Sequence, residues 1–548
     1  MRLKISSLSF LILLLICLQN GLAQKQFSLK DSLRGSLNPS RMYDVKFYDL
    51  SIEFDIPEKK IQGICQMNIM ATQEQQTIQV DLFENLKVDK VLIDNKEQKF
   101  SRLYNTIQIP YLLKTGAKKL IEIHYSGKPI AAKRAPWDGG FTWQKDKQDR
   151  DWIAVSCEGI GASLWWPNKD HLSDEPDSMK MHFTVPENLV AVSNGNLLKT
   201  DSKKTGTKTY HWAVSYPINN YNVTFYIGHY QSFKDSYSAQ DGQILDIEHY
   251  VLDYNLDKAK NHFKQTKKVL EAFEFYLGKY PFWRDGFSLV EAPFAGMEHQ
   301  SAIAYGNGFQ RGYYGALIPD EFDFDYIILH ESGHEYFGNS VSCNDIAEMW
   351  IHESFTTYLE SLFIEYYYGK SAAVSYLQSQ RSFIANKQSI VRTKGVNDEP
   401  EDSDQYYKGA WMLQSLRKCI DQDSIWFGII KEFYQSHALS HATTEDFINL
   451  VNQRTKKNFT AVVHQYLNHN KIPVLEYKID QKSDYTDFSY RWVVDEKDFS
   501  MPVWFKLDKK VIKLEAGTEW QNMSMSRAYQ SVEALNKDVL IDLKLLNN

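Results

Sequence analysis

The sequence predicts a multi-domain α+β protein in which a β-rich part, a mainly helical part and a smaller β part follow one another. Its 548 residues are too many for one compact core, because a typical domain holds about 150 residues. Hydrophobic residues make up 43% of the chain and aromatic residues 14%, which is enough apolar surface for several buried cores. The period of the apolar residues changes twice along the chain, and we expect these changes to mark the domains.

Residues 1–23 are typical of a secretory signal peptide. Arg2 and Lys4 precede an apolar run over 8–18, and the small residues of Gly-Leu-Ala at 21–23 fit a cleavage site. The run is shorter than the roughly 20 residues that cross a bilayer, and no later segment could do so, so we expect no stable membrane span. The sequence therefore predicts a secreted or periplasmic protein. Lipidation at Cys17 is only a minor alternative, because the residue before it is bulky where lipoprotein cleavage sites have a small one.

Residues 24–232 are predicted to form an antiparallel β-sheet domain. Short runs in which apolar and polar residues alternate are separated by turn residues, as in the segment 44–55. The segments 120–125 and 209–214 have a similar character. Alternation places successive side chains on opposite faces of a strand, so each of these runs predicts a half-buried strand.

Residues 233–470 are predicted to be mainly helical. From about residue 255 the apolar residues recur every three or four positions, which is the period of one helix face. The segments with this spacing are 258–277, 324–339, 350–368, 372–386 and 405–420.

Residues 471–548 are predicted to form a small β-sandwich-like domain. Strand-like runs return after Pro473, at 474–479, 489–494 and 539–543.

The charge and cysteine content exclude some classes of partner and leave the disulfides open. The chain has 62 Lys and Arg against 69 Asp and Glu, a net charge of -7, and no basic stripe that could follow a phosphate backbone. We therefore expect no nucleic-acid partner. The four cysteines beyond the signal peptide are widely spaced, which permits disulfides in an oxidising compartment but predicts no pairing.

The segment 324–338 contains the pattern H-E-x-x-H as His330, Glu331 and His334. Residues four apart on an α-helix point about 40° apart, so both imidazoles can bind one cation. Glu331 is offset by about 100° from His330, which places it beside a water molecule rather than among the ligands. The pattern predicts a hydrolytic zinc site with Glu331 as general base, although a structural histidine pair would also explain these five residues.

An open zinc site needs a third protein ligand, and Glu353 is the candidate. It follows His334 after eighteen intervening residues and lies in the helical run 350–360. In isolation it could be an ordinary solvated carboxylate on an amphipathic helix. Its spacing from the histidines favours the role of ligand.

This spacing resembles the signature of the gluzincin aminopeptidases typified by aminopeptidase N, in which H-E-x-x-H is followed by eighteen residues and then Glu. Phe337 to Asn339, Val341 and Trp350 also match the family. The resemblance follows the family order over nearly the whole chain beyond the signal peptide. It implies a thermolysin-like fold for 233–470, one zinc ion on the three ligands named above, and a short form without the large helical C-terminal domain.

Three further segments resemble family motifs for substrate binding and catalysis. Residues 294–299 are similar to the exopeptidase motif G-x-M-E-N, which implies substrate binding by Gly296, Met297 and Glu298, with Glu298 on the free α-amine. Ser156-Cys-Glu resembles the element Q-C-E/Q, which implies a second contact of the amine with Glu158. The run Tyr-Tyr-Lys-Gly that begins at Tyr406 resembles Y-x-K-G, which implies that Tyr406 stabilises the oxyanion. Each carboxylate could instead be an ordinary loop residue, and Tyr406 a core aromatic.

Several positions depart from the family pattern. Ala295 and His299 replace a glycine and an asparagine of the exopeptidase motif, and His352 precedes the third ligand where asparagine is usual. None of these changes removes a ligand or the base. Ser156 replaces a glutamine and Phe294 would lie near the first specificity pocket, so the preferred N-terminal residue stays open.

The sequence therefore predicts a zinc aminopeptidase that acts on peptides with a free N-terminus. Three alternatives remain: a zinc endopeptidase of the same clan, a non-catalytic peptide-binding relative, and the epoxide hydrolysis found in one branch of the family. The oligomeric state is not predicted.

Overall fold

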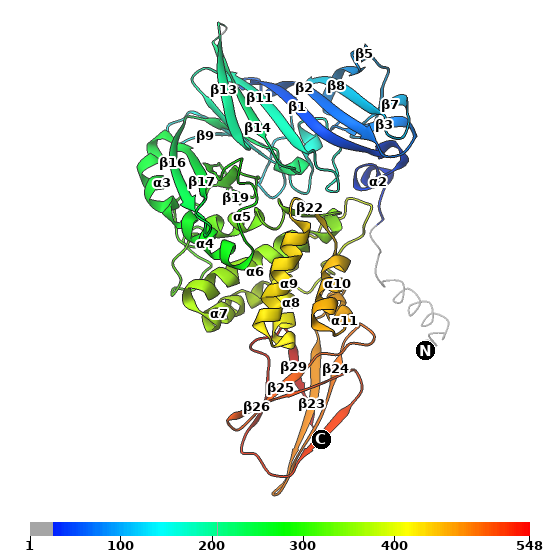
Figure 1. Ribbon diagram of the computed structural model, residues 1–548, viewed down its shortest axis with the longest axis vertical. Helices are drawn as coiled ribbons and strands as arrows, with labels where there is room; N and C mark the ends of the chain where they lie inside the picture. Colours follow the sequence, from blue (N-terminus) through cyan, green and yellow to red (C-terminus); the bar gives the residue numbers. More distant parts are fainter. Residues whose placement is uncertain (1–25, 205, 548) are drawn as a thin grey trace, which may run out of the picture.

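The computed structural model describes residues 26–204 and 206–547, and it has three parts arranged along its long axis (Figure 1). The N-terminal β-sheets lie at one end, the helices in the middle, and a small set of strands at the other end. This arrangement agrees with the predicted α+β class. The predicted signal peptide and Cys17 lie outside the described residues.

Three sheets and a short helix form the N-terminal part. The eight-stranded sheet consists, in spatial order, of β13 (Asn196–Lys203), β14 (Thr207–Val214), β11 (Ser178–Pro186), β1 (Tyr43–Asp55), β2 (Lys60–Ala71), β8 (Lys118–Gly127), β4 (Leu86–Ile93) and β5 (Lys96–Glu97). The four-stranded sheet consists of β12 (Val190–Ser193), β15 (Phe225–Gly228), β10 (Asp151–Ser156) and β9 (Gly140–Lys145). The three-stranded sheet consists of β3 (Gln75–Asp81), β7 (Thr106–Leu113) and β6 (Ser101–Leu103). The helix α2 (Leu29–Gly35) precedes all of these strands.

The alternation in β1 determines which of its side chains are buried. Tyr48, Leu50 and Ile52 are each at most 2% exposed and belong to the core of this part. The eight-stranded sheet is antiparallel except that β1 and β11 run parallel, with Phe47 opposite Ser178. Alternation fixes the face to which a side chain points, but it carries no information about the direction of the neighbouring strand.

The middle part combines helices with a five-stranded sheet. The sheet consists of β16 (Tyr230–Ser238), β17 (Ile244–Leu252), β18 (Leu289–Glu291), β20 (Ile303–Tyr305) and β19 (Gly296–Met297), in that spatial order. The helices are α3 (Leu256–His262), α4 (Thr266–Tyr276), α5 (Tyr326–His334), α6 (Trp350–Tyr368), α7 (Lys370–Gln380), α8 (Tyr407–Ile420), α9 (Asp423–His437), α10 (Thr444–Thr455) and α11 (Thr460–Leu467). A short parallel pair, β21 (Val341–Cys343) and β22 (Ser440–Ala442), lies beside them. The strands of two or three residues were not predicted, because they are too short to show a period.

The helix predicted over 324–339 is shorter than expected. Asp325 caps its start by accepting hydrogen bonds from the N–H groups of Ile327 and Ile328, and α5 ends at His334. The chain then turns through Gly338, whose φ of +127° favours glycine. The prediction was too long because the residues of this turn are also buried, so the apolar spacing in the sequence continues beyond the end of the helix.

Two small sheets form the C-terminal part. The first consists of β27 (Gln521–Met525), β24 (Thr486–Val493), β23 (Val474–Gln481) and β29 (Asp542–Leu545), and the second of β26 (Lys510–Leu514), β25 (Val503–Leu507) and β28 (Val532–Leu535). The strand predicted at 539–543 begins only at Asp542. The N–H of Leu540 instead donates to Ser415 Oγ at 2.9 Å, and its carbonyl accepts from the Tyr466 hydroxyl at 2.7 Å. The segment 539–541 is therefore bound to the helices, and one core runs through both parts.

The described cysteines are all buried and free, so no disulfide links the residues that the structure describes. Over the same ranges, no helix is both long enough and apolar enough to cross a bilayer.

Candidate active site

α5 and α6 bring the three predicted metal ligands together. The Nε2 atoms of His330 and His334 are 3.2 Å apart. Glu353 Oε2 lies 3.3 Å from His334 Nε2 and 3.6 Å from His330 Nε2. The four-residue spacing on α5 places both imidazoles on one side of that helix, and the first turn of α6 supplies the carboxylate.

The hydrogen bonds of the two imidazoles orient them for a cation. His330 Nδ1 donates to Glu360 Oε1 at 2.6 Å, and His334 Nδ1 donates to the carbonyl of Phe337 at 3.0 Å. Each ring therefore directs the lone pair of Nε2 toward the other ring. Glu353 Oε2 is buried and has no hydrogen-bond partner among the described residues. Two facing lone pairs and an unpaired buried oxygen repel one another unless a cation lies between them, so the donor set fits one metal ion.

The charges around this set also favour a cation. Burial opposes protonation of His334, but Glu353 and Glu298 outweigh it and raise its pKa to about 9. Burial alone would raise the pKa of Glu353, yet His334 and His330 hold it well below its ordinary value. The site thus stabilises positive charge. Two imidazoles and one carboxylate form the donor set of open, catalytic zinc sites.

A second set of groups, Glu298, Glu331 and His334, also has ligand atoms within 4.8 Å of one another. Glu298 already accepts a hydrogen bond from the Tyr221 hydroxyl at 2.8 Å. The free nitrogen of His334 faces His330 and Glu353. Glu298 and Glu331 therefore border the metal set rather than compete with it.

Glu331, the predicted base, is buried beside the strand β19. Burial raises its pKa to about 7, although His330 and His334 act in the opposite direction. A Cβ atom at Gly296 would lie 2.4 Å from Glu331 Oε1, so the missing side chain lets β19 approach the carboxylate. β19 is the outermost strand of its sheet, and its second residue, Met297, is buried.

Glu298 follows β19 directly and is held from two sides. Its side chain accepts from Tyr221, and its backbone carbonyl accepts from Asn339 Nδ2 at 2.7 Å. It is 3% exposed, and burial raises its pKa. Tyr221 comes from the N-terminal part and had no signal in the sequence. The site is therefore built by both parts of the chain.

Glu158 lies on the loop after β10, close enough to these groups to sense their charge. Burial raises its pKa well above the ordinary value, and the charges of Glu298 and Glu353 add to that effect. Glu158, whose motif is the least specific match to the family, thus lies near the same site as Glu298.

Tyr406 lies just before α8, with its ring centroid 6.1 Å from that of His330. The other matching residues of its motif have structural contacts. Lys408 Nζ donates to two backbone carbonyls just after α11. A Cβ atom at Gly409 would lie 1.7 Å from Ser354 Oγ on α6, so only glycine permits this close packing. Lys408 and Gly409 thereby fix the start of α8, where Tyr406 lies.

Glu360 is a site residue that the sequence reasoning missed. Besides the bond to His330, its Oε2 accepts from the Tyr376 hydroxyl at 2.6 Å and from Gln380 Nε2 at 3.1 Å. It is fully buried. Its place seven residues after Glu353, on the same face of α6, was a signal that could have found it.

We expect Glu360→Gln to weaken Zn²⁺ binding by about 10- to 100-fold, because an amide neither orients the His330 ring nor raises its basicity as a carboxylate does. Competition with a chromogenic chelator measures this. Glu365→Gln on the same helix is the matched control, since Glu365 pairs with Arg417 and lies outside the metal set. Equal zinc affinity in both variants would contradict the orienting role.

Two domain models of one protein family match most of the chain. The peptidase family M1 domain matches residues 254–466, and the peptidase M1 N-terminal domain matches residues 45–221. A leucyl aminopeptidase of Saccharolobus solfataricus is 19% identical over 493 residues, which cover 86% of this chain and 60% of the relative. An aminopeptidase N of Lactobacillus helveticus is 24% identical over 475 residues, which cover 79% and 52%. The chain thus spans between half and two thirds of the length of these relatives.

Among solved structures, the fold is similar to that of an M1 zinc metallopeptidase variant from Deinococcus radiodurans bound to a Tyr-Ser-Ala substrate. The TM-score is 0.68 at 17% identity, and the match covers 80% of this chain and 98% of that chain. At this low sequence identity, the similarity shows only that the two proteins share a fold.

Proposed function

Because this chain belongs to peptidase family M1, we propose that it is a zinc-dependent aminopeptidase that removes residues from the N-terminus of peptides. The observation that carries the proposal is the position of Glu298. This buried carboxylate borders a set of three metal-ligating side chains, where the ammonium group of a bound peptide would neutralise it.

His330, His334 and Glu353 would hold one Zn²⁺ ion, since their donor atoms converge and the carboxylate oxygen has no other partner among the described residues. The chemistry of this ion is Lewis acidity, which polarises a carbonyl and lowers the pKa of a water molecule.

Glu331 would accept the proton of the attacking water and pass it to the leaving amine. Its carboxylate lies beside the metal set but is not needed as a ligand, so it is available for proton transfer. Tyr406 would donate a hydrogen bond to the oxyanion of the tetrahedral intermediate, a contact worth roughly 3–4 kcal/mol.

Glu298 and Glu158 would bind the α-ammonium group, and the outer edge of β19 at Gly296 and Met297 would pair with the peptide backbone. An internal peptide bond brings no ammonium group to this place. The buried carboxylates would then remain unpaired, which disfavours internal cleavage and sets the length of the product to one residue. From the predicted signal peptide we also propose that the enzyme acts outside the cytoplasm.

A panel of aminoacyl chromogenic amides and their N-acetylated counterparts tests this function. We expect the free amides to be cleaved about 100-fold faster or more, because the acetyl group removes the positive charge that Glu298 requires. Glu298→Ala should reduce the ratio, mainly by slowing cleavage of the free amides. Equal cleavage of free and acetylated substrates by the wild type would instead indicate an endopeptidase.

A further inference from the structure

Arg34, near the end of α2, holds the loop that carries Glu158. Its Nη1 donates to the carbonyl of Ile160 at 2.6 Å and its Nη2 to that of Gly159 at 2.8 Å. Its Nε lies 3.3 Å from the carboxylate of Asp170. One guanidinium group therefore binds both residues that follow Glu158, although α2 is more than a hundred residues away in the chain.

The loop contains one turn, in which the N–H of Gly161 donates to the carbonyls of Cys157 at 2.8 Å and of Glu158 at 3.2 Å. Gly159 and Gly161 both have positive φ, +40° and +97°. A Cβ atom at Gly161 would lie 2.5 Å from Arg34 Cζ and 2.3 Å from Asp170 Oδ2, so this glycine makes room for the ion pair. The carbonyls of Gly159 and Ile160 take no part in that turn, and Arg34 binds both of them from outside the loop.

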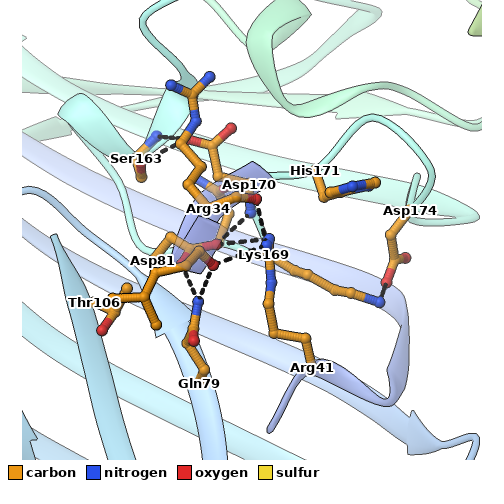
Figure 2. Close-up of polar contacts among 12 residues, drawn as sticks. Arg34, Arg41, Gln79, Asp81, Thr106, Ser163, Lys169, Asp170, His171 and Asp174 are labelled. Atoms are coloured by element: carbon orange, nitrogen blue, oxygen red, sulfur yellow. Dashed lines mark hydrogen bonds and ion pairs between the residues drawn. The ribbon is translucent and has the colours of Figure 1, made fainter. Parts of the chain in front are cut away.

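Arg34 is in turn anchored through a buried series of charges (Figure 2). Asp170 accepts from Ser163 Oγ at 2.5 Å, and its backbone N–H donates to Asp81 Oδ2 at 2.9 Å. Asp81 binds Arg41 at 2.8 Å in a pair that is at most 1% exposed. The two arginines lie at the ends of this series and the two carboxylates between them, joined by the backbone N–H of Asp170, so the guanidinium group of Arg34 has a fixed counter-ion.

Arg41 also fixes the helix that presents Arg34. It donates to the carbonyls of Leu33, Arg34 and Ser36, which α2 would otherwise leave unpaired at its C-terminal end. Gln79 Nε2 adds a bond to the carbonyl of Leu33 at 2.7 Å. α2 is thus bound rigidly to the sheets of the N-terminal part.

The same end of α2 lines a pocket that reaches the predicted amine-binding site. Arg34, Glu158 and Tyr221 all line it, and Tyr221 binds the carboxylate of Glu298. A Cβ atom at Gly35 would lie 2.2 Å from the backbone of Val396, so α2 also contacts the segment before α8. The helix therefore touches the surroundings of the amine site on two sides.

We propose that Arg34 is a positioning residue for the amine site: it holds the Gly159 and Ile160 carbonyls so that Glu158 faces the substrate's ammonium group. This inference rests on the proposed aminopeptidase function. It assigns α2, which the sequence did not connect to the site, a part in substrate binding.

The test is steady-state kinetics with a free aminoacyl chromogenic amide. We expect Arg34→Ala to raise KM about tenfold or more, since both hydrogen bonds to the loop and the ion pair with Asp170 are lost, and to change kcat less than about threefold. Arg34→Lys keeps the charge but cannot bind two carbonyls at once, so its KM should be intermediate. If Arg34→Ala does not fold, the KM of Arg34→Lys tests the proposal instead.

Arg150→Ala is the matched control. Arg150 is 21% exposed, against 18% for Arg34, and binds Asp146 and Asp253 just before the start of β10, at the opposite end of that strand from Glu158. Its loss should lower the melting temperature, while KM stays within about twofold of the wild type.

The double variant with Glu158→Ala separates positioning from general stability. If Arg34 acts through Glu158, Arg34→Ala adds less than about twofold to KM in that background. An unchanged KM in Arg34→Ala, or a full effect that persists in Glu158→Ala, would overturn the inference. Failure of the aminopeptidase function itself would look different, because the wild type would then not cleave the free amide.

Discussion

Glu331→Gln is expected to abolish hydrolysis while the protein keeps its metal. The amide has the shape of the carboxylate but cannot accept a proton, so kcat/KM should fall on the order of 10³- to 10⁴-fold. The metal should stay bound, because the carboxylate of Glu331 borders the three groups predicted to hold the ion without being one of them. The measurements are turnover of a free aminoacyl amide and zinc content by elemental analysis.

Glu335→Gln is the control, one helical turn further along. Glu335 is also buried, and it accepts from the N–H of Ser301 at 2.8 Å and from the Tyr280 hydroxyl at 3.0 Å. An amide can keep both contacts, because the Tyr280 hydroxyl also donates to the carbonyl of Gly286 and can accept in return. Activity of this variant should stay within about threefold of the wild type. Unchanged activity in Glu331→Gln would reject the mechanism outright.

Glu353→Gln is expected to remove the metal itself. An amide oxygen carries no full charge and is a poor zinc ligand, so the affinity for Zn²⁺ should fall by more than about 100-fold. The buried His330 and His334 would then lose the carboxylate that favours a cation between them. After dialysis the wild type should hold about one zinc ion per chain and the variant almost none, with activity lost in proportion.

Glu348→Gln is the control for this variant. Glu348 is 1% exposed, lies just before α6, and binds the N–H of Thr444 and the ammonium group of Lys394. Its substitution should lower the melting temperature and leave the zinc content near one ion per chain. Full zinc content in Glu353→Gln would assign the third ligand to another residue, and the neighbouring Glu298 would be the first to examine.

Much of the candidate site could be predicted because the predicted metal ligands lie on two helices. His330 and His334 share a face of α5, so the sequence spacing alone predicted that they meet. Glu360 lies on the same face of α6 as Glu353, and the same argument would have found it. Tyr221 and Arg34 could not be found in this way. They come from the N-terminal part, and no local period connects them with Glu298 or Glu158.

The same distinction between local patterns and contacts of distant segments applies to the fold. Alternation predicted the strands of the N-terminal part, but the parallel pairing of β1 with β11 joins residues more than a hundred positions apart. The buried segment 539–541 had the composition of a strand, and its binding to Ser415 and Tyr466 made it a link to the helices instead. A buried apolar run satisfies either arrangement equally well.

The sequence by itself predicted the order of the three parts, the faces of the helices and the three candidate metal ligands, because the apolar period of each part is local and the spacing of the ligands matches a family signature. Only the tertiary structure decided which groups of the N-terminal part surround them: Tyr221 against Glu298, and α2 beneath the loop of Glu158. These contacts join elements distant in the chain, and their geometry is set by the packing of the parts against one another rather than by any local pattern.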